Sequence, residues 1–196
     1  MKRLMLMTAL VLSFQSETQA QSFSGETELG TDGRGEAFAS QYAFMDGSKW
    51  NILVRYFKVH EVLSRGEFAI GPSFKLKSGL AKLQFGYTTD EGVMTAGLLV
   101  VNVKGHDVIY ILDGKLSTRG GPYELYQKLF VSMVKVGRTE FLLRGENLRI
   151  GGSSSFLRLG VESQFKLNSR NSHIFVAPFY CLDRRHVSGQ IGLRLF

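Results

Sequence analysis

Residues 67–76 read EFAIGPSFKL, and in this stretch large apolar side chains alternate with small or charged ones. Phe68, Ile70, Phe74 and Leu76 all stand at even positions. Successive side chains of an extended chain point to opposite sides, so a period of two places these residues on one face of a β-strand. The stretch therefore predicts a strand with one apolar face and one face that carries charge.

The same alternation recurs along the chain, clearly at residues 50–56, 157–167 and 191–195. Charged residues return on the polar parity too often for the packed interior of a soluble protein. Other stretches are apolar on both parities, and helix competes with strand there. The strongest helical alternative is residues 123–136, because Pro122 stands where a helix would start.

All candidate segments together make about twelve strands. They are expected at residues 22–29, 36–44, 49–59, 67–77, 80–88, 93–103, 107–113, 123–136, 139–145, 155–167, 173–182 and 187–196. Hydrocarbon offers backbone groups no partner except a neighbouring strand, so strands that cross a membrane must close on themselves. The expected fold is all-β, a closed antiparallel transmembrane β-barrel of about 12 strands, with about 10 as the lower bound. A soluble, secreted β-sandwich or lipid-binding barrel is the alternative.

The first twenty residues have the pattern of a secretory signal peptide. Lys2 and Arg3 form a positive start, residues 4–14 are apolar, and Ala20 ends a cleavage site of small residues. The mature chain, residues 21–196, is expected to be one barrel domain. No run of about twenty apolar residues follows, which excludes a transmembrane helix.

The formal net charge is +7, and the basic residues are scattered rather than clustered. Nucleic-acid binding is therefore not expected. Cys181 is the only cysteine, which excludes an internal disulfide. His106 and His173 have no ligand residue at a suitable spacing, so we expect neither a metal site nor a cofactor.

The connectors are expected to alternate in length. Those on the side of the chain termini are mostly tight turns, at residues 46–48, 78–79, 104–106, 137–138 and 168–172. Those on the other side are mostly longer, at residues 30–35, 60–66, 89–92, 114–122, 146–154 and 183–186. Short periplasmic turns and longer extracellular loops are typical of outer-membrane barrels.

These features resemble bacterial outer-membrane β-barrel proteins as a class: a signal peptide, alternating strands, and a last strand that ends in Phe196. The resemblance covers residues 21–196. It implies an outer-membrane location, contact with outer-membrane lipids including lipopolysaccharide, and insertion by the barrel-assembly machinery. Phe196 looks like the assembly signal, although the last apolar row runs through Ile191, Leu193 and Leu195 and is out of step with it.

The polar rows of such a barrel face its lumen. The residues expected to line it include Arg55, Glu67, Lys82, Glu140, Arg144, Arg158, Glu162 and Arg194. If these groups are spaced apart, they line a narrow water-filled passage. If they pair, they form an ion-pair network that plugs the barrel. The leading hypothesis is a small passive channel or transport-related barrel for polar solutes, and a closed structural or adhesive barrel is an alternative.

Six basic residues fall in or beside the expected outer loops: Arg65, Lys115, Arg119, Arg149, Arg184 and Arg185. Phosphorylated lipid headgroups would attract these cations, so they are candidates for contact with lipopolysaccharide. The alternative is that they are ordinary solvated loop residues.

His186 and Ser188 are the best candidates for a catalytic pair, because their spacing places both on one face of the last strand. The spacing looks like the His-x-Ser element of the lipid A deacylases of outer membranes, which implies a lipid-modifying enzyme. No carboxylate follows His186, and the rest of that family's pattern is absent. A polar junction between loop and strand is the favoured interpretation.

Overall fold

The computed structural model describes residues 22–31, 36–47, 49–59, 63–151, 153–167 and 172–195. In these ranges the chain forms twelve strands that close into one antiparallel barrel. The fold class predicted from the alternation is therefore confirmed. The expected signal peptide, residues 1–20, and the terminal Phe196 lie outside the described residues.

Each predicted strand corresponds to an observed one. The strands are β1 (Ser22–Thr31), β2 (Ala37–Asp46), β3 (Trp50–Val59), β4 (Leu63–Leu76), β5 (Gly79–Thr88), β6 (Gly92–Val103), β7 (His106–Ser117), β8 (Glu124–Val136), β9 (Thr139–Ile150), β10 (Ser153–Lys166), β11 (His173–Cys181) and β12 (His186–Leu195). The helical alternative for residues 123–136 is wrong, because β8 pairs with β7 on one edge and with β9 on the other. The described residues contain no helix that is long and apolar enough to cross a membrane.

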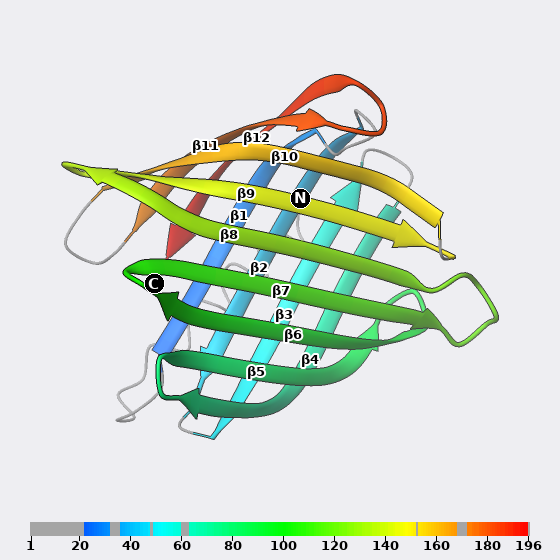
Figure 1. The fold of residues 1–196 in the computed structure, drawn as a ribbon. Coiled ribbons are helices and arrows are strands. Elements are labelled where there is room, and N and C mark those ends of the chain that lie inside the picture. Colours follow the sequence, from blue (N-terminus) through cyan, green and yellow to red (C-terminus); the bar gives the residue numbers. More distant parts are fainter. Residues whose placement is uncertain are drawn as a thin grey trace.

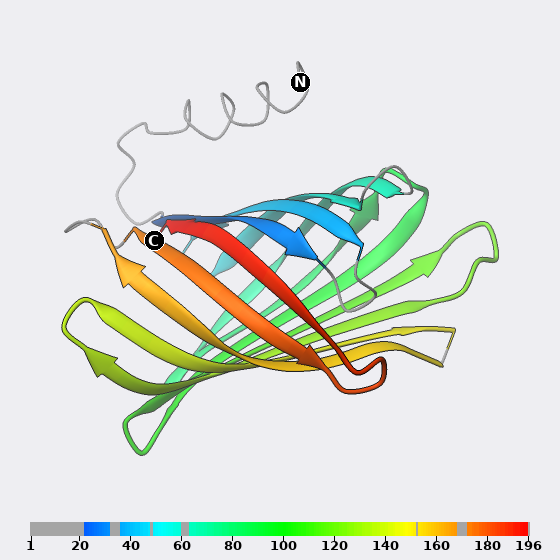
Figure 2. The ribbon, with the colours of Figure 1, turned by 90° about the horizontal axis from the view of Figure 1, so that it is seen from above.

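The barrel closes where β1 pairs with β12. Gly25 lies opposite Leu195, and Gly30 lies opposite Gln190. Figure 2 shows this seam, with β1 in blue beside β12 in red. Closure gives every strand two hydrogen-bonded neighbours and leaves no free edge. We call the end that holds Ser22 and Leu195 the inner end, and the opposite end the outer end.

The two walls of the barrel run at a steep angle to one another, as Figure 1 shows for β1 to β4 behind β6 to β9. Strands that are far apart in the sheet order therefore face each other across the lumen. Side chains that point inward from these walls can meet on the barrel axis.

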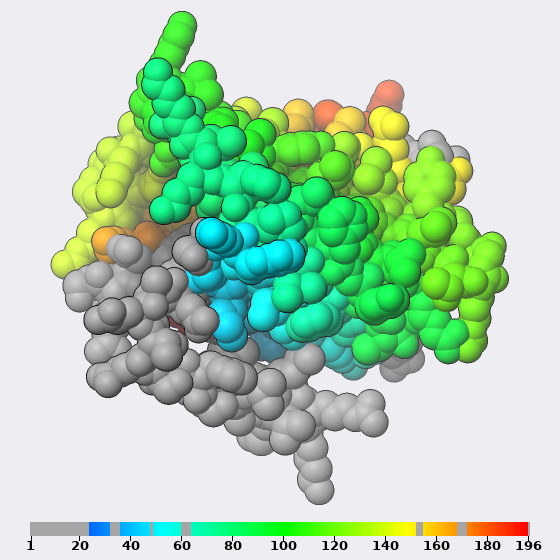
Figure 3. Space-filling view, turned by 90° about the horizontal axis from the view of Figure 1, so that it is seen from below, coloured from blue at the N-terminus to red at the C-terminus, as the bar shows by residue number. Residues whose placement is uncertain are grey.

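The two faces of the strands differ strongly in exposure. In β11, Ile174 and Val176 keep 40% and 48% of their surface exposed, whereas Phe175 and Ala177 are completely buried. Figure 3 shows one side of the outer surface, where side chains of the segments coloured cyan to green project outward. So extensive an apolar surface is unfavourable in water and matches the lipid-facing belt of a membrane barrel.

The expected difference between short inner turns and long outer loops is largely absent. β4 begins at Leu63 instead of Glu67, β7 continues to Ser117, and β9 continues to Ile150. Residues 146–150 were expected to belong to an outer loop, but they continue the ladder with β8 and β10. Glu146, Leu148 and Ile150 share the inward parity, whereas Asn147 and Arg149 lie on the other parity, so the segment is a strand whose inner face is partly apolar.

Candidate functional site

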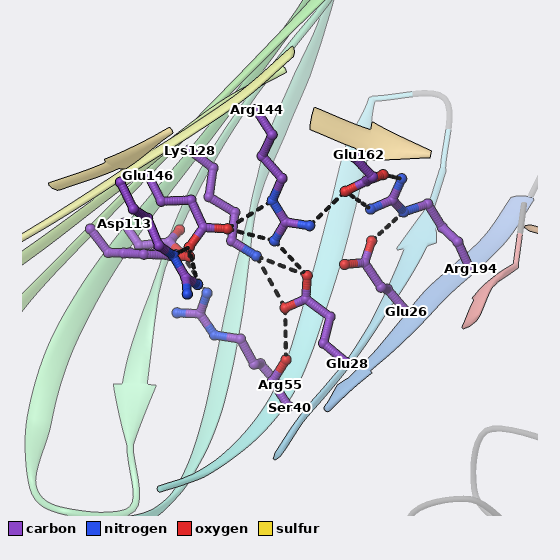
Figure 4. Close-up of polar contacts among 12 residues, drawn as sticks. Glu26, Glu28, Ser40, Arg55, Asp113, Lys128, Arg144, Glu146, Glu162 and Arg194 are labelled. Atoms are coloured by element: carbon purple, nitrogen blue, oxygen red, sulfur yellow. Dashed lines mark hydrogen bonds and ion pairs between the residues drawn. The ribbon is translucent and has the colours of Figure 1, made fainter. Parts of the chain in front are cut away.

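Charged side chains from several strands meet inside the barrel (Figure 4). Glu28 of β1 lies at the centre of this group. Its carboxylate accepts hydrogen bonds from Lys128 Nζ at 3.1 Å, from Arg144 Nη2 at 2.8 Å and from Ser40 Oγ at 3.1 Å. Lys128 belongs to β8 and Arg144 to β9, and neither strand neighbours β1 in the sheet. These bonds therefore cross the lumen.

Arg144 has no exposed surface and is held on several sides. Its guanidinium group pairs with Glu146 and with Glu162, each at 2.5 Å. The guanidinium carbon also lies 4.9 Å from the ring centroid of Phe130 and 5.2 Å from that of Phe179. Cations stack favourably on aromatic faces, so these rings replace part of the water that the arginine has lost.

Two further arginines extend the group. Arg158 donates to Glu146 at 2.6 Å and to the Ser188 hydroxyl at 3.2 Å. Arg194 donates to Glu162 at 2.7 Å and also pairs with a second carboxylate, that of Glu26.

We call this group the central network: Glu26, Glu28, Lys128, Arg144, Glu146, Arg158, Glu162 and Arg194. It joins four carboxylates to four cations, so its charges balance. Removing ions from water is unfavourable unless each one is paired and hydrogen-bonded. Every member of the network has an ion-pair partner, and Glu26 Oε1 is the one oxygen of its carboxylates that is buried without a hydrogen bond among the described residues.

A second group lies nearer the outer end. Arg55 of β3 pairs with its neighbour Glu67 and with Asp113 of β7, on another part of the wall. Arg65 of β4 donates to Glu124 of β8 at 2.8 Å. The outer network comprises Arg55, Arg65, Glu67, Asp90, Asp113, Lys115 and Glu124. Its ion pairs also join strands that are not adjacent in the sheet.

Asp90 lies in the turn between β5 and β6 and belongs to the outer network. Partial burial raises the pKa of Asp90, but hydrogen bonds from Lys115 and Thr88 and the charge of Arg65 outweigh it. The net result is a pKa below the ordinary 3.8. Asp90 is therefore ionised at neutral pH and holds the Lys115 ammonium at the mouth of the barrel.

The structure places most of the predicted lumen residues within these networks. Arg55 and Glu67 belong to the outer network, and Arg144, Arg158, Glu162 and Arg194 belong to the central one. Lys82 is buried apart from both, with its ammonium 2.5 Å from Asp46. Glu140 is half-buried near the inner end, opposite Lys135 and Gln164.

The expected headgroup residues divide into two sets. Arg65 and Lys115 lie in strands and not in loops, and their side chains pair with carboxylates of the outer network. The expectation that they lie in or beside outer loops is therefore corrected, because the strands are longer than the sequence pattern indicated. Four residues are exposed: Arg119, Arg149, Arg184 and Arg185.

The structure does not assemble a catalytic pair at the membrane surface. Ser188 is buried and points into the barrel, where its hydroxyl contacts Arg158 and lies 3.6 Å from the Cys181 sulfur. His186 is half-buried and its Nε2 has no partner among the described residues. The shared face of these two residues is the lumenal face, so lipid outside the barrel does not meet the Ser188 hydroxyl.

Sequence reasoning missed half of the central network. Glu26 and Glu28 alternate with Thr27 and Leu29, and this pattern could have identified them. Lys128 lies in a stretch that is apolar on both parities, so the sequence pattern does not indicate whether its side chain faces the lumen. Glu146 lay in an expected loop, although it continues the parity of Arg144.

Apolar residues also face the lumen, where mainly polar ones were expected. Leu53, Ala69, Met94 and Ala96 form a buried cluster with 0% to 4% exposure, against which Tyr42 and Phe44 pack. A cavity of about 200 Å³ lies beside this cluster and continues toward the outer network. The lumen thus has a filled region at the central network and, on its outer side, a cavity whose mainly apolar wall is continuous with the outer network.

Comparison with solved structures identifies similar architectures. The NanC porin, in a rhombohedral crystal form, matches with a TM-score of 0.65 and 9% sequence identity, over 88% of this chain and 99% of that chain. This chain has a porin fold. The KdgM porin matches with a TM-score of 0.64 and 10% identity, over 88% and 98% of the two chains. The KdgM porin in complex with disordered oligogalacturonate has the same TM-score at 9% identity.

No family model and no curated protein matches the sequence. At such low identity the likeness to NanC and KdgM concerns the fold alone. The porin fold confirms, at the level of architecture, the resemblance to bacterial outer-membrane β-barrels that the sequence indicated.

Proposed function

We propose that this porin-fold barrel lies in a bacterial outer membrane and passes small polar solutes by passive diffusion. The observation that carries the proposal is that charged side chains line the lumen at two levels, in the outer network and in the central network. Charged groups along a pore can replace part of the hydration shell of a passing polar solute. The apolar outer belt supports a membrane location for this lining.

The ion pairs that cross the lumen limit the size of the solute. Arg55 and Asp113 join two parts of the wall, and Glu28 joins β1 to both β8 and β9. Because these side chains cross the lumen, the passage is narrow and its conductance should be low.

Planar-bilayer recording tests the proposal. The barrel should be purified from outer membranes of cells that express the full chain, where its first residue is expected to be Gln21 after removal of the signal peptide. The wild type should give small conductance steps above background. Glu28→Ala should give larger steps, with greater preference for anions, because it removes a crossing carboxylate and leaves Lys128 and Arg144 unpaired.

The matched control is Glu91→Ala, which removes a carboxylate that pairs with Arg119 in the exposed outer turns. Its conductance should equal that of the wild type. If neither the wild type nor Glu28→Ala conducts, the channel proposal is rejected. A closed structural barrel is the second candidate, and the crossing ion pairs favour it. A silent wild type beside a conducting Glu28→Ala would show that the central network closes the lumen.

A further inference from the structure

The apolar cavity has a definite position in the lumen. Val59 and Ile150, the last residues of β3 and β9, belong to its lining, so it reaches the outer end. Glu28 and Lys128 line its other side, where the central network begins. The cavity is therefore a chamber that the central network separates from the inner end.

The wall of the chamber is mainly aromatic and aliphatic. Tyr42 and Phe44 pack edge to face at 5.5 Å between ring centroids, and Phe38 and Phe57 lie 5.9 Å apart. Met94 adds a flexible thioether, which adapts its shape to aromatic neighbours. Water gains few hydrogen bonds from such a wall, whereas an apolar ring would gain contacts.

Two buried amide groups in the lining have unused hydrogen-bonding atoms. Gln84 of β5 is 2% exposed, and its Nε2 has no partner within the described residues. Gln190 of β12 is 4% exposed, and its Oε1 likewise has none there. Unpaired buried polar atoms are rare and unfavourable in folded proteins. A ligand with a hydrogen-bonding group would satisfy one of them.

The charges around the chamber favour an uncharged ligand. At the outer end, Arg65 and Lys115 already share the carboxylates of Glu124 and Asp90. At the other side, Glu28 and Lys128 pair with each other. A charged ligand would have to displace these ion pairs, and a neutral one would not.

We propose that the chamber binds a small uncharged ring compound that carries one hydroxyl or amide group. The size follows from the volume of about 200 Å³, since an apolar cavity of about 150 Å³ accommodates benzene. The ring packs between the aromatic walls, and its polar group bonds to Gln84 or Gln190. This inference goes beyond passive diffusion, because it assigns a saturable binding site to the outer half of the lumen.

Equilibrium dialysis with p-cresol tests the proposal, with the barrel purified in detergent and empty micelles as the blank. The wild type should bind one p-cresol per barrel saturably. Ala96→Phe should weaken binding at least about tenfold, because it fills the chamber beside Gln84. The matched control is Thr95→Phe, the next residue of β6, whose side chain is exposed on the other face. It should bind as the wild type does.

A second comparison tests the hydrogen bond and does not depend on the folding of Ala96→Phe. Gln84→Leu and Gln190→Leu together should weaken binding of p-cresol but leave toluene unaffected, because toluene has no polar group. Binding that rises linearly with concentration, as in empty micelles, would overturn the proposal. Equal loss of p-cresol and toluene would overturn the role of the amides. Dialysis detects binding whether or not the barrel conducts, so this test and the bilayer recording can fail independently.

Discussion

Glu28 shows how one side chain can join the two walls of a barrel. It is 2% exposed and accepts hydrogen bonds from Lys128, Arg144 and Ser40. A buried ion pair gains little over an apolar pair of the same shape, but removal of one partner leaves an uncompensated charge. Loss of Glu28 should therefore destabilise the barrel mainly because it leaves buried cations without a partner, and less because its own hydrogen bonds are lost.

Glu28→Gln should destabilise the barrel by about 3 kcal/mol, because Lys128 and Arg144 are buried and lose a charged partner. The measurement is guanidinium-induced unfolding in detergent, followed by the fluorescence of Trp50, the single tryptophan. Glu91→Gln is the control, since Glu91 and Arg119 are 52% and 75% exposed in their side chains. It should cost less than about 0.5 kcal/mol. Equal effects of the two substitutions would mean that the central network is hydrated.

At the scale of the strand, the alternation of apolar and polar residues predicts the outer face of the barrel well and the inner face poorly. The outer face must be apolar because it meets hydrocarbon. The inner face has no such uniform requirement, and it combines Lys128 with Phe130 in β8 and Arg158 with Phe156 in β10. Aromatic rings are needed inside to stack on the buried guanidinium groups.

β12 provides a matched pair for testing the outer face. Ile191 lies in the middle of the strand and is 52% exposed, whereas Val187 lies next to the outer end and is 74% exposed. Ile191→Lys should destabilise the folded barrel by about 2–4 kcal/mol, and Val187→Lys by about 1 kcal/mol or less. Unfolding in phospholipid vesicles measures both values. Small and equal effects would indicate that the outer face does not meet hydrocarbon.

At the scale of the whole molecule, exposed arginines place positive charge at the outer end of the barrel. Arg184 and Arg185 are exposed in the turn between β11 and β12. Phosphate groups of lipopolysaccharide would accept bidentate hydrogen bonds from guanidinium groups. We propose that these arginines contact lipopolysaccharide when the outer end faces the cell exterior.

Replacement of Arg184 and Arg185 by Asn should lower the amount of lipopolysaccharide that copurifies with the barrel from outer membranes, as native mass spectrometry measures it. Asn suits position 185, where φ is 53°. The control is Lys104→Asn in an inner-end turn, where φ is 52°, and it should change nothing. If only Lys104→Asn lowers the amount of bound lipopolysaccharide, the inner end and not the outer end faces the cell exterior.

The sequence by itself determined the strands, their even number and the outward apolar rows, because contact with hydrocarbon imposes the same rule on every strand. It also indicated that Arg144, Arg158 and Glu162 face the lumen, since local parity decides direction. Only the tertiary structure decided which charges meet. Glu28 and Lys128 lie 100 residues apart in the chain, and they meet because the barrel closes and its walls cross at a steep angle. The apolar chamber arose in the same way, from inward residues of separate strands whose contacts no local pattern encodes.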